Sequence, residues 1–149
     1  MPEISVSVDV DAPVEVVWRA VVDWPAQADW MVLTRVTATR GDGHAVGDEL
    51  VAFTGLGRVG FLDTMTITAY DAPRRCVVRH TGRVVRGTAA FEVLPLGADR
   101  ARFVWTEWLD LPLGLLGRLG FAVLRPLIRW PLRRSLRTFA RSVTRPAAS

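Results

Sequence analysis

Hydrophobic and polar residues alternate one by one at the start of the chain, from Glu3 to Val10. A period of two residues is typical of a strand with one buried face. Six further strand-like segments follow, bounded by turns rich in glycine, aspartate and proline, at residues 32–40, 48–54, 60–70, 75–81, 84–94 and 100–109. Because most of the connections are short, an antiparallel meander is favoured.

Two helical segments are expected between the first and second strands. Hydrophobic residues recur at helical spacing from Val14 to Val21, and Pro13 suits the first turn of a helix. This helix should end near Trp24, because the residue before a proline resists the helical conformation. A short second helical turn is expected over residues 26–30.

The end of the chain predicts a dominant helix over residues 113–143. At about 100° per residue, Arg118, Arg125 and Arg129 form one narrow stripe, and apolar side chains cover the rest of the circumference. Such a helix has to lie in a core, along a sheet or on a lipid surface. Pro126 and Pro131 each lack a backbone donor, so we expect either two helical pieces or one bent helix.

Length and composition indicate one domain, with residues 1–145 forming the domain and residues 146–149 a frayed tail. The single cysteine, Cys76, excludes an intrachain disulfide and a cysteine-based zinc cluster. The N-terminus lacks the charged start and apolar run of a secretory signal. The most apolar stretch, near residues 111–132, is interrupted by three arginines and by Pro126 and Pro131, so it is unsuited to span a bilayer. We therefore expect a cytoplasmic protein.

The basic residues are all arginine, and the charge is unevenly distributed along the chain. All fifteen acidic residues lie at or before Asp110, and eight arginines follow it. No DNA- or RNA-binding motif accompanies these arginines, so no nucleic-acid partner is predicted. Arginines on the outer face of a helix are typical of a solvated surface. The alternative is that the arginine-rich helix binds a membrane surface or a protein partner.

The order of the expected elements and several short motifs resemble the START-like helix-grip superfamily, also called SRPBCC, in its polyketide cyclase/dehydrase-like branch. The motifs are Ala12-Pro13, Val17-Trp18, Asp23-Trp24, Trp30, Gly47-Asp48, Pro73-Arg74-Arg75, F-x-W-x-E at residues 103–107, and Leu113-Gly114. They are spread over nearly the whole chain.

The resemblance implies an α+β helix-grip fold. This fold is a curved antiparallel sheet of about seven strands, wrapped around a long, proline-kinked C-terminal helix, with two short helices after the first strand. It implies an apolar cavity between the sheet and that helix. The superfamily supports ligand carriage, cyclisation, hydrolysis and structural roles, so the resemblance alone does not select an activity.

Three ionisable residues are predicted to face the cavity. Strand alternation places Asp63, His80 and Glu107 each on the otherwise apolar face of its strand. A carboxylate on an apolar wall should have a raised pKa, and a neighbouring histidine can transfer protons near neutral pH, as an aldol-type cyclase or dehydratase needs. The alternative is structural: these groups pair with an arginine such as Arg58, Arg79 or Arg83, or lie at a solvated rim.

A larger set of apolar residues is the candidate ligand-binding wall: Trp30, Phe53, Phe61, Met65, Phe91, Trp105, Phe121 and Leu124. Trp30 with Met31 is expected to act as a lid. The same residues also suit an ordinary packed core. No metal site is predicted, because no histidine pair has helical ligand spacing. The run from Gly55 to Gly60 fits G-x-G-x-x-G but links two strands, so we interpret it as a flexible hairpin at the cavity entrance.

The leading hypothesis is binding of a small hydrophobic or aromatic molecule in the internal cavity, without a cofactor. A cyclase or dehydratase that uses Asp63, His80 and Glu107 as acid and base groups is the second. A membrane-surface or partner-binding module that uses the arginine-rich helix is the third.

Overall fold

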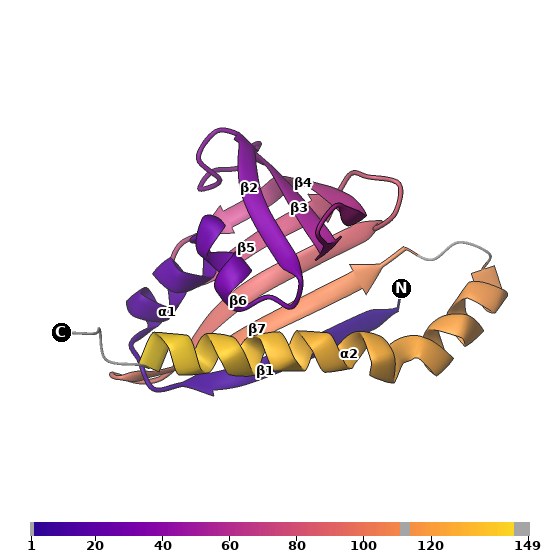
Figure 1. Ribbon diagram of the computed structural model, residues 1–149. Helices are drawn as coiled ribbons and strands as arrows, with labels where there is room; N and C mark the ends of the chain where they lie inside the picture. Colours follow the sequence, from indigo (N-terminus) through magenta and orange to yellow (C-terminus); the bar gives the residue numbers. More distant parts are fainter. Residues whose placement is uncertain (1, 111–113, 145–149) are drawn as a thin grey trace.

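The computed structural model describes residues 2–110 and 114–144 (Figure 1). In chain order the elements are β1 (Glu3–Val10), α1 (Val14–Val21), the 3-10 helix η1 (Pro25–Asp29), β2 (Thr34–Arg40), β3 (Glu49–Leu56), β4 (Val59–Asp71), β5 (Arg75–His80), β6 (Gly87–Gly97), β7 (Arg100–Leu109) and α2 (Gly114–Thr144). The expected seven strands, two short helices and long terminal helix are therefore confirmed. The expected tail at residues 146–149 lies outside the described residues.

The strands form one antiparallel sheet in the order β1-β7-β6-β5-β4-β3-β2. Strands β2 to β7 form a meander. The last strand, β7, pairs with the first strand, β1, with Val6 opposite Trp105. The sheet curves, as Figure 1 shows. Predicted strand bounds differ most at β6, which was expected at residues 84–94. Strand β6 instead begins at Gly87, because residues 81–86 form a loop before its pairing with β5 starts.

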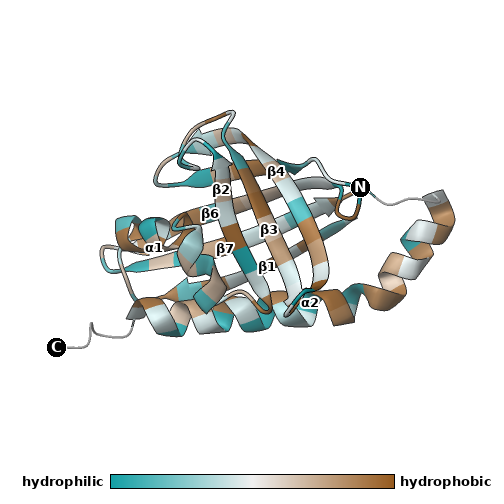
Figure 2. Ribbon diagram, turned by 45° about the horizontal axis from the view of Figure 1, so that its top comes forward, coloured by the Kyte–Doolittle hydropathy of each residue, from teal (hydrophilic) through white to brown (hydrophobic). Residues whose placement is uncertain are grey.

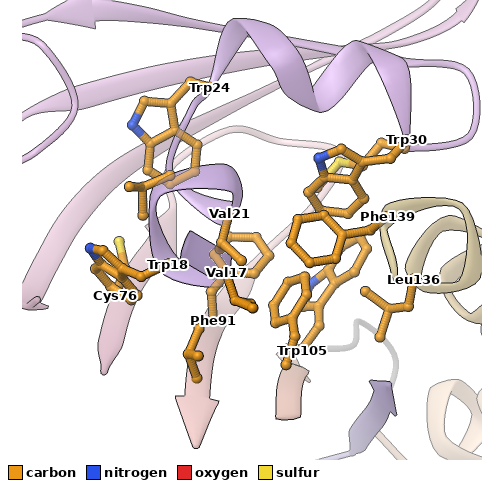
Figure 3. Close-up of a cluster of buried hydrophobic side chains, with 14 of the residues drawn as sticks. Val17, Trp18, Val21, Trp24, Trp30, Cys76, Phe91, Trp105, Leu136 and Phe139 are labelled. Atoms are coloured by element: carbon orange, nitrogen blue, oxygen red, sulfur yellow. The ribbon is translucent and has the colours of Figure 1, made fainter. Parts of the chain in front are cut away.

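The hydrophobic core includes the region where α1, η1 and the second half of α2 meet the sheet. Phe139 of α2 is fully buried and packs edge-to-face on Trp30 and Phe103, each with ring centroids 5.0 Å away. Figure 3 shows Trp30 above Phe139, with Trp105 and Leu136 beside them. Aromatic edge-to-face contacts add to the stabilisation from burial, so this cluster fixes one end of α2 on the sheet.

Helix α2 is one continuous helix that includes Pro126 and Pro131. It bends in its first half, as both ribbon views show (Figures 1 and 2). The alternative of one bent helix, rather than two pieces, is therefore the one observed. Neither α2, the longest described helix, nor either of the others contains a stretch with the length and hydropathy of a bilayer span.

The two halves of α2 have different environments. In the second half, Leu136 and Phe139 are buried, and Ser135 accepts a hydrogen bond from the Val32 backbone N–H at 2.9 Å. In the first half, most of the apolar side chains are exposed, and the Arg125 guanidinium donates to the Glu3 carbonyl of β1. Most of the apolar side chains on this half of the helix therefore lie outside the hydrophobic core.

The packing of Phe139 gives a direct test of the helix anchor. Phe139→Ala should lower the free energy of unfolding by about 3–5 kcal/mol, because it removes a buried ring and leaves a cavity. Val123→Ala is the control: Val123 is 77% exposed on the same helix, and its truncation should change the free energy by less than about 0.5 kcal/mol. Chemical denaturation measures both. Equal effects would contradict the anchor.

Candidate functional site

A cavity of about 530 Å³ lies between the inward face of the sheet and the middle of α2. Each of the strands β3 to β7 contributes apolar side chains to its wall, among them Ala52, Met65, Val78, Phe91 and Trp105. Helix α2 closes it with Leu127, Ile128, Pro131, Leu132 and Ser135. A mostly apolar, concave space of this size matches the usual dimensions of small-molecule sites.

A cluster of ionisable side chains interrupts this mostly apolar wall. The His80 imidazole bridges two carboxyl groups: its Nδ1 lies 2.8 Å from Asp63 Oδ1, and its Nε2 lies 3.0 Å from Glu107 Oε2. The Trp105 indole N–H donates to the other oxygen of Glu107 at 3.1 Å. All three residues line the cavity, and their side chains are 3–15% exposed. We call Asp63, His80 and Glu107 the polar triad.

Two small residues lie on the strand between His80 and Glu107. His80 on β5 and Glu107 on β7 are separated by β6, where Gly87 is opposite His80 and Ala89 is opposite Glu107. Paired residues of neighbouring strands share a face, so these two positions determine how much space lies between the triad side chains. A Cβ at Gly87 would come within 2.0 Å of the Trp108 carbonyl oxygen. Glycine is therefore required there, both by this close backbone approach and by its positive φ of 121°.

The electrostatic balance keeps a proton on His80. Burial alone would lower the pKa of His80, because it disfavours the charged imidazolium. The hydrogen bonds to Asp63 and Glu107, and then the charges of these carboxylates, outweigh burial and raise the pKa to about 9. At neutral pH the imidazole is thus protonated, and both ring nitrogens donate.

Other reactive groups are poorly placed for chemistry. Burial raises the pKa of the Cys76 thiol to about 12, so it is not a nucleophile at neutral pH. Within residues 2–110 and 114–144, no set of three or more His, Cys, Asp or Glu side chains is arranged to hold a metal ion. Both nitrogens of His80 are already engaged by carboxylates, so neither is available as a ligand.

The structure brings together the three residues predicted to carry chemistry, because alternation along each strand places them inward. The predicted pairing with Arg58, Arg79 or Arg83 is not observed among the described residues; the carboxylates pair with His80 instead. Four of the predicted apolar residues also line the cavity: Phe61, Met65, Phe91 and Trp105.

The other four predicted binding residues lie elsewhere. Trp30 is buried in the cluster with Phe103 and Phe139, and only its neighbour Met31 lines the cavity. Phe53 is on the opposite face of β3 from the inward Ala52, where the Arg35 guanidinium lies 5.3 Å from its ring centroid. Phe121 and Leu124 precede the stretch of α2 that closes the cavity, and Leu124 is half exposed.

Some cavity residues were not selected from the sequence. Ile4 lines the cavity from β1, and alternation along that strand already marks it as inward. Gln27 also lines it, and its buried amide donates to the Val21 carbonyl at 2.9 Å. Ser135 also lines the cavity. The sequence gives no sign of this, because a serine among the arginines of a surface helix is ordinarily solvated.

Comparisons with known proteins agree with this architecture. Residues 1–144 match the family described as polyketide cyclase / dehydrase and lipid transport. No curated protein sequence matches the chain.

Several solved structures share the fold. The Zhui aromatase/cyclase from Streptomyces sp. R1128 is 15% identical, with a TM-score of 0.79 over 99% of this chain and 96% of that one. Norcoclaurine synthase from Thalictrum flavum is 17% identical, with a TM-score of 0.66 over 95% and 93%. The di-domain ARO/CYC protein BexL from the BE-7585A biosynthetic pathway is 18% identical, with a TM-score of 0.74, and the match covers 98% of this chain and 48% of BexL.

At these identities the solved structures show the fold alone. The family match is different in kind, because it extends over almost the entire sequence. The protein belongs to the polyketide cyclase/dehydrase and lipid transport family.

Proposed function

We propose that the protein binds a small, mainly hydrophobic or aromatic molecule in the cavity between the sheet and α2. The observation that carries the proposal is a cavity of about 530 Å³ with mostly apolar walls and one cluster of charged side chains, the polar triad. An apolar ligand there would remove its own surface and that of the wall from water, which is favourable by roughly 25 cal/mol per Å² of apolar surface buried.

The polar triad sets a preference for one end of the ligand. Two carboxylates flank one imidazolium, so the triad has an excess of acceptors. Asp63 Oδ2 receives no hydrogen bond from any described residue, although Asp63 lines the cavity. A ligand with a hydroxyl or amine donor would be favoured at this point, and one with a carboxylate or sulfonate would be repelled.

The cyclase or dehydratase is the second candidate, favoured by the hydrogen-bonded chain of ionisable groups on the cavity wall. Structures named as aromatase/cyclases share the fold, which is consistent with this candidate. In a dehydration, Asp63 would accept the proton α to a ketone while the C–O bond at the β carbon breaks. Glu107 would pass a proton from His80 Nε2 to the departing hydroxyl, so that water and a conjugated enone form and His80 is left neutral.

Ligand binding is tested with two dyes that share one ring skeleton. Neutral N-phenylnaphthylamine should gain fluorescence with the wild-type protein, and its anionic counterpart anilinonaphthalene sulfonate should bind more weakly. Ala52→Phe and Ala89→Phe each place a ring in the cavity from a different wall, and each should weaken binding of the neutral dye by about tenfold or more. The two alanines are buried and line the cavity.

Ala98→Phe is the matched control, because Ala98 is exposed in the turn between β6 and β7. It should leave the dye affinity unchanged. Circular dichroism establishes that each variant is folded. A folded cavity-filled variant with wild-type affinity would disprove binding in this cavity.

The enzyme candidate predicts turnover of an aryl β-hydroxyketone, whose conjugated product absorbs in the near ultraviolet. Asp63→Asn and Glu107→Gln should each slow the reaction by about a hundredfold, the usual contribution of general acid–base catalysis. Asp99→Asn, at an exposed turn, should not affect it. A rate with wild-type protein no faster than in buffer, for this and related β-hydroxyketones, would exclude the enzyme candidate.

The charge state of His80 predicts a pH dependence of stability. The pKa is raised in the folded state from 6.5 to about 9, so the stabilisation is complete below pH 6.5 and is lost as the pH rises to about 9. Relative to His80→Gln, the wild-type protein should lose roughly 3 kcal/mol of unfolding free energy across this range. Urea unfolding at several pH values measures the loss.

His44→Gln serves as the control, because His44 and His80 are the chain's two histidines. This variant should keep the wild-type pH dependence. In this variant His80 is the one remaining histidine, and its imidazole resonance in an NMR titration of the folded protein should have a midpoint near pH 9. A midpoint near 6.5 would show that the triad does not hold the proton.

A further inference from the structure

Apolar side chains gather at one end of the molecule without being covered. They come from the β3–β4 hairpin, the β5–β6 loop and the first half of α2, and we call them the end surface: Leu56, Val59, Leu62, Val84, Leu115, Leu116, Leu119 and Val123. Each is 57–81% exposed. Isolated exposed leucines and valines are normal, but a group of this size on neighbouring segments marks an interaction site.

Backbone hydrogen bonds place the hairpin, the β5–β6 loop and the end of β7 side by side. Leu56 pairs with Val59 at the tip of the hairpin. The Thr81 N–H donates to the Thr64 carbonyl at 2.7 Å, which sets the β5–β6 loop beside the hairpin. The Asp110 N–H donates to the Arg86 carbonyl at 3.1 Å, so β7 ends beside the same loop, and α2 begins at Gly114. Figure 1 shows the hairpin and the loop on the side of the sheet toward which α2 begins, with the first turns of α2 extending beyond them.

The cavity reaches this same end. Phe61, Val85 and Leu109 line it, and they belong to the hairpin, the β5–β6 loop and the end of β7. Phe61 is also 38% exposed, so its ring contacts both the cavity and solvent. The cavity therefore extends to the segments that carry the end surface, and it is partly open to solvent at Phe61.

The charges of the end surface select its partner. Arg58, Arg83, Arg86 and Arg118 are exposed among the apolar residues, and none of them forms an ion pair within the described part of the chain. Helix α2 has no acidic residue from Gly114 to Thr144. Exposed acids nearby are few, namely Glu3 and Asp110.

We propose that the end surface docks on an anionic lipid membrane, with the first half of α2 lying in the interface. Leucines interspersed with arginines are what an interfacial helix needs, since the leucines enter the acyl boundary and the arginines contact anionic headgroups. No described helix suits a bilayer span, so the contact is with the surface. A second copy of the chain fits less well, because it would bring the same positive charges together.

Docking would place the cavity opening against the lipid. An apolar ligand could then pass between membrane and cavity without crossing water, which would otherwise cost its transfer free energy. The docking surface is on the outside of the fold, so the proposal goes beyond ligand binding and does not depend on it.

Vesicle flotation tests the proposal. The wild-type protein should float with vesicles of phosphatidylcholine and phosphatidylglycerol, not with phosphatidylcholine alone, and should bind less at high salt. Leu115→Ser with Leu119→Ser should weaken binding by about tenfold or more, and so should Arg58→Gln with Arg118→Gln.

The controls are matched pairs at the opposite end of the sheet. Leu94→Ser with Leu96→Ser, and Arg40→Gln with Arg74→Gln, change exposed residues there and should leave binding unchanged. The cavity-filled Ala89→Phe variant should still float, which separates failure of docking from failure of ligand binding.

Three results would overturn the proposal. The first is no flotation with anionic vesicles, and the second is equal loss in the control pairs. The third is sedimentation as a dimer that Leu115→Ser with Leu119→Ser converts to a monomer, which would assign the surface to a second copy.

Discussion

The fold depends on where α2 is held against the sheet. Phe139 and Leu136 pack in the cluster with Trp30 and Phe103, and this contact involves only the second half of the helix. A helix in full contact along its length would fill the inner face of the sheet. The tight packing is confined to the second half of α2. The middle of the helix covers the inner face of the sheet without filling the space beneath it, and that space is the cavity.

The second constraint is that the cavity wall carries charged side chains that are largely buried. An isolated buried carboxylate is costly, and a pair of them more so. The structure places one imidazolium between Asp63 and Glu107. Hydrogen bonds to both carboxylates, together with their charges, stabilise the protonated imidazole and raise the pKa of His80. Strand β6 lies between His80 and Glu107 and carries only Gly87 and Ala89 at the positions paired with them.

Much of the fold could be predicted from the sequence, because alternation and turn residues are local signals. The same parity placed Asp63, His80 and Glu107 inward. Applied to β3, it also implies that Phe53 faces away from Ala52, so an aromatic residue alone was a poor guide to the cavity.

Other features depend on contacts between distant segments. That His80 itself bridges the two carboxylates follows from the strand register, which the sequence does not display. That Trp30 belongs to the cluster with Phe139 follows from the path of α2, more than a hundred residues later in the chain.

Pro126 and Pro131 predicted a helix with a bend, yet they could not predict its consequence. In the second half of the bent helix Leu136 and Phe139 are buried, whereas most apolar side chains of the first half are exposed. Figure 2 shows that hydrophobic residues are frequent along this first half. Leaving this surface exposed costs hydrophobic stabilisation that straight packing on a sheet would have recovered. The geometry that leaves the cavity open is therefore also the geometry that leaves α2 with an unburied face, and both are properties of one helix held at one end.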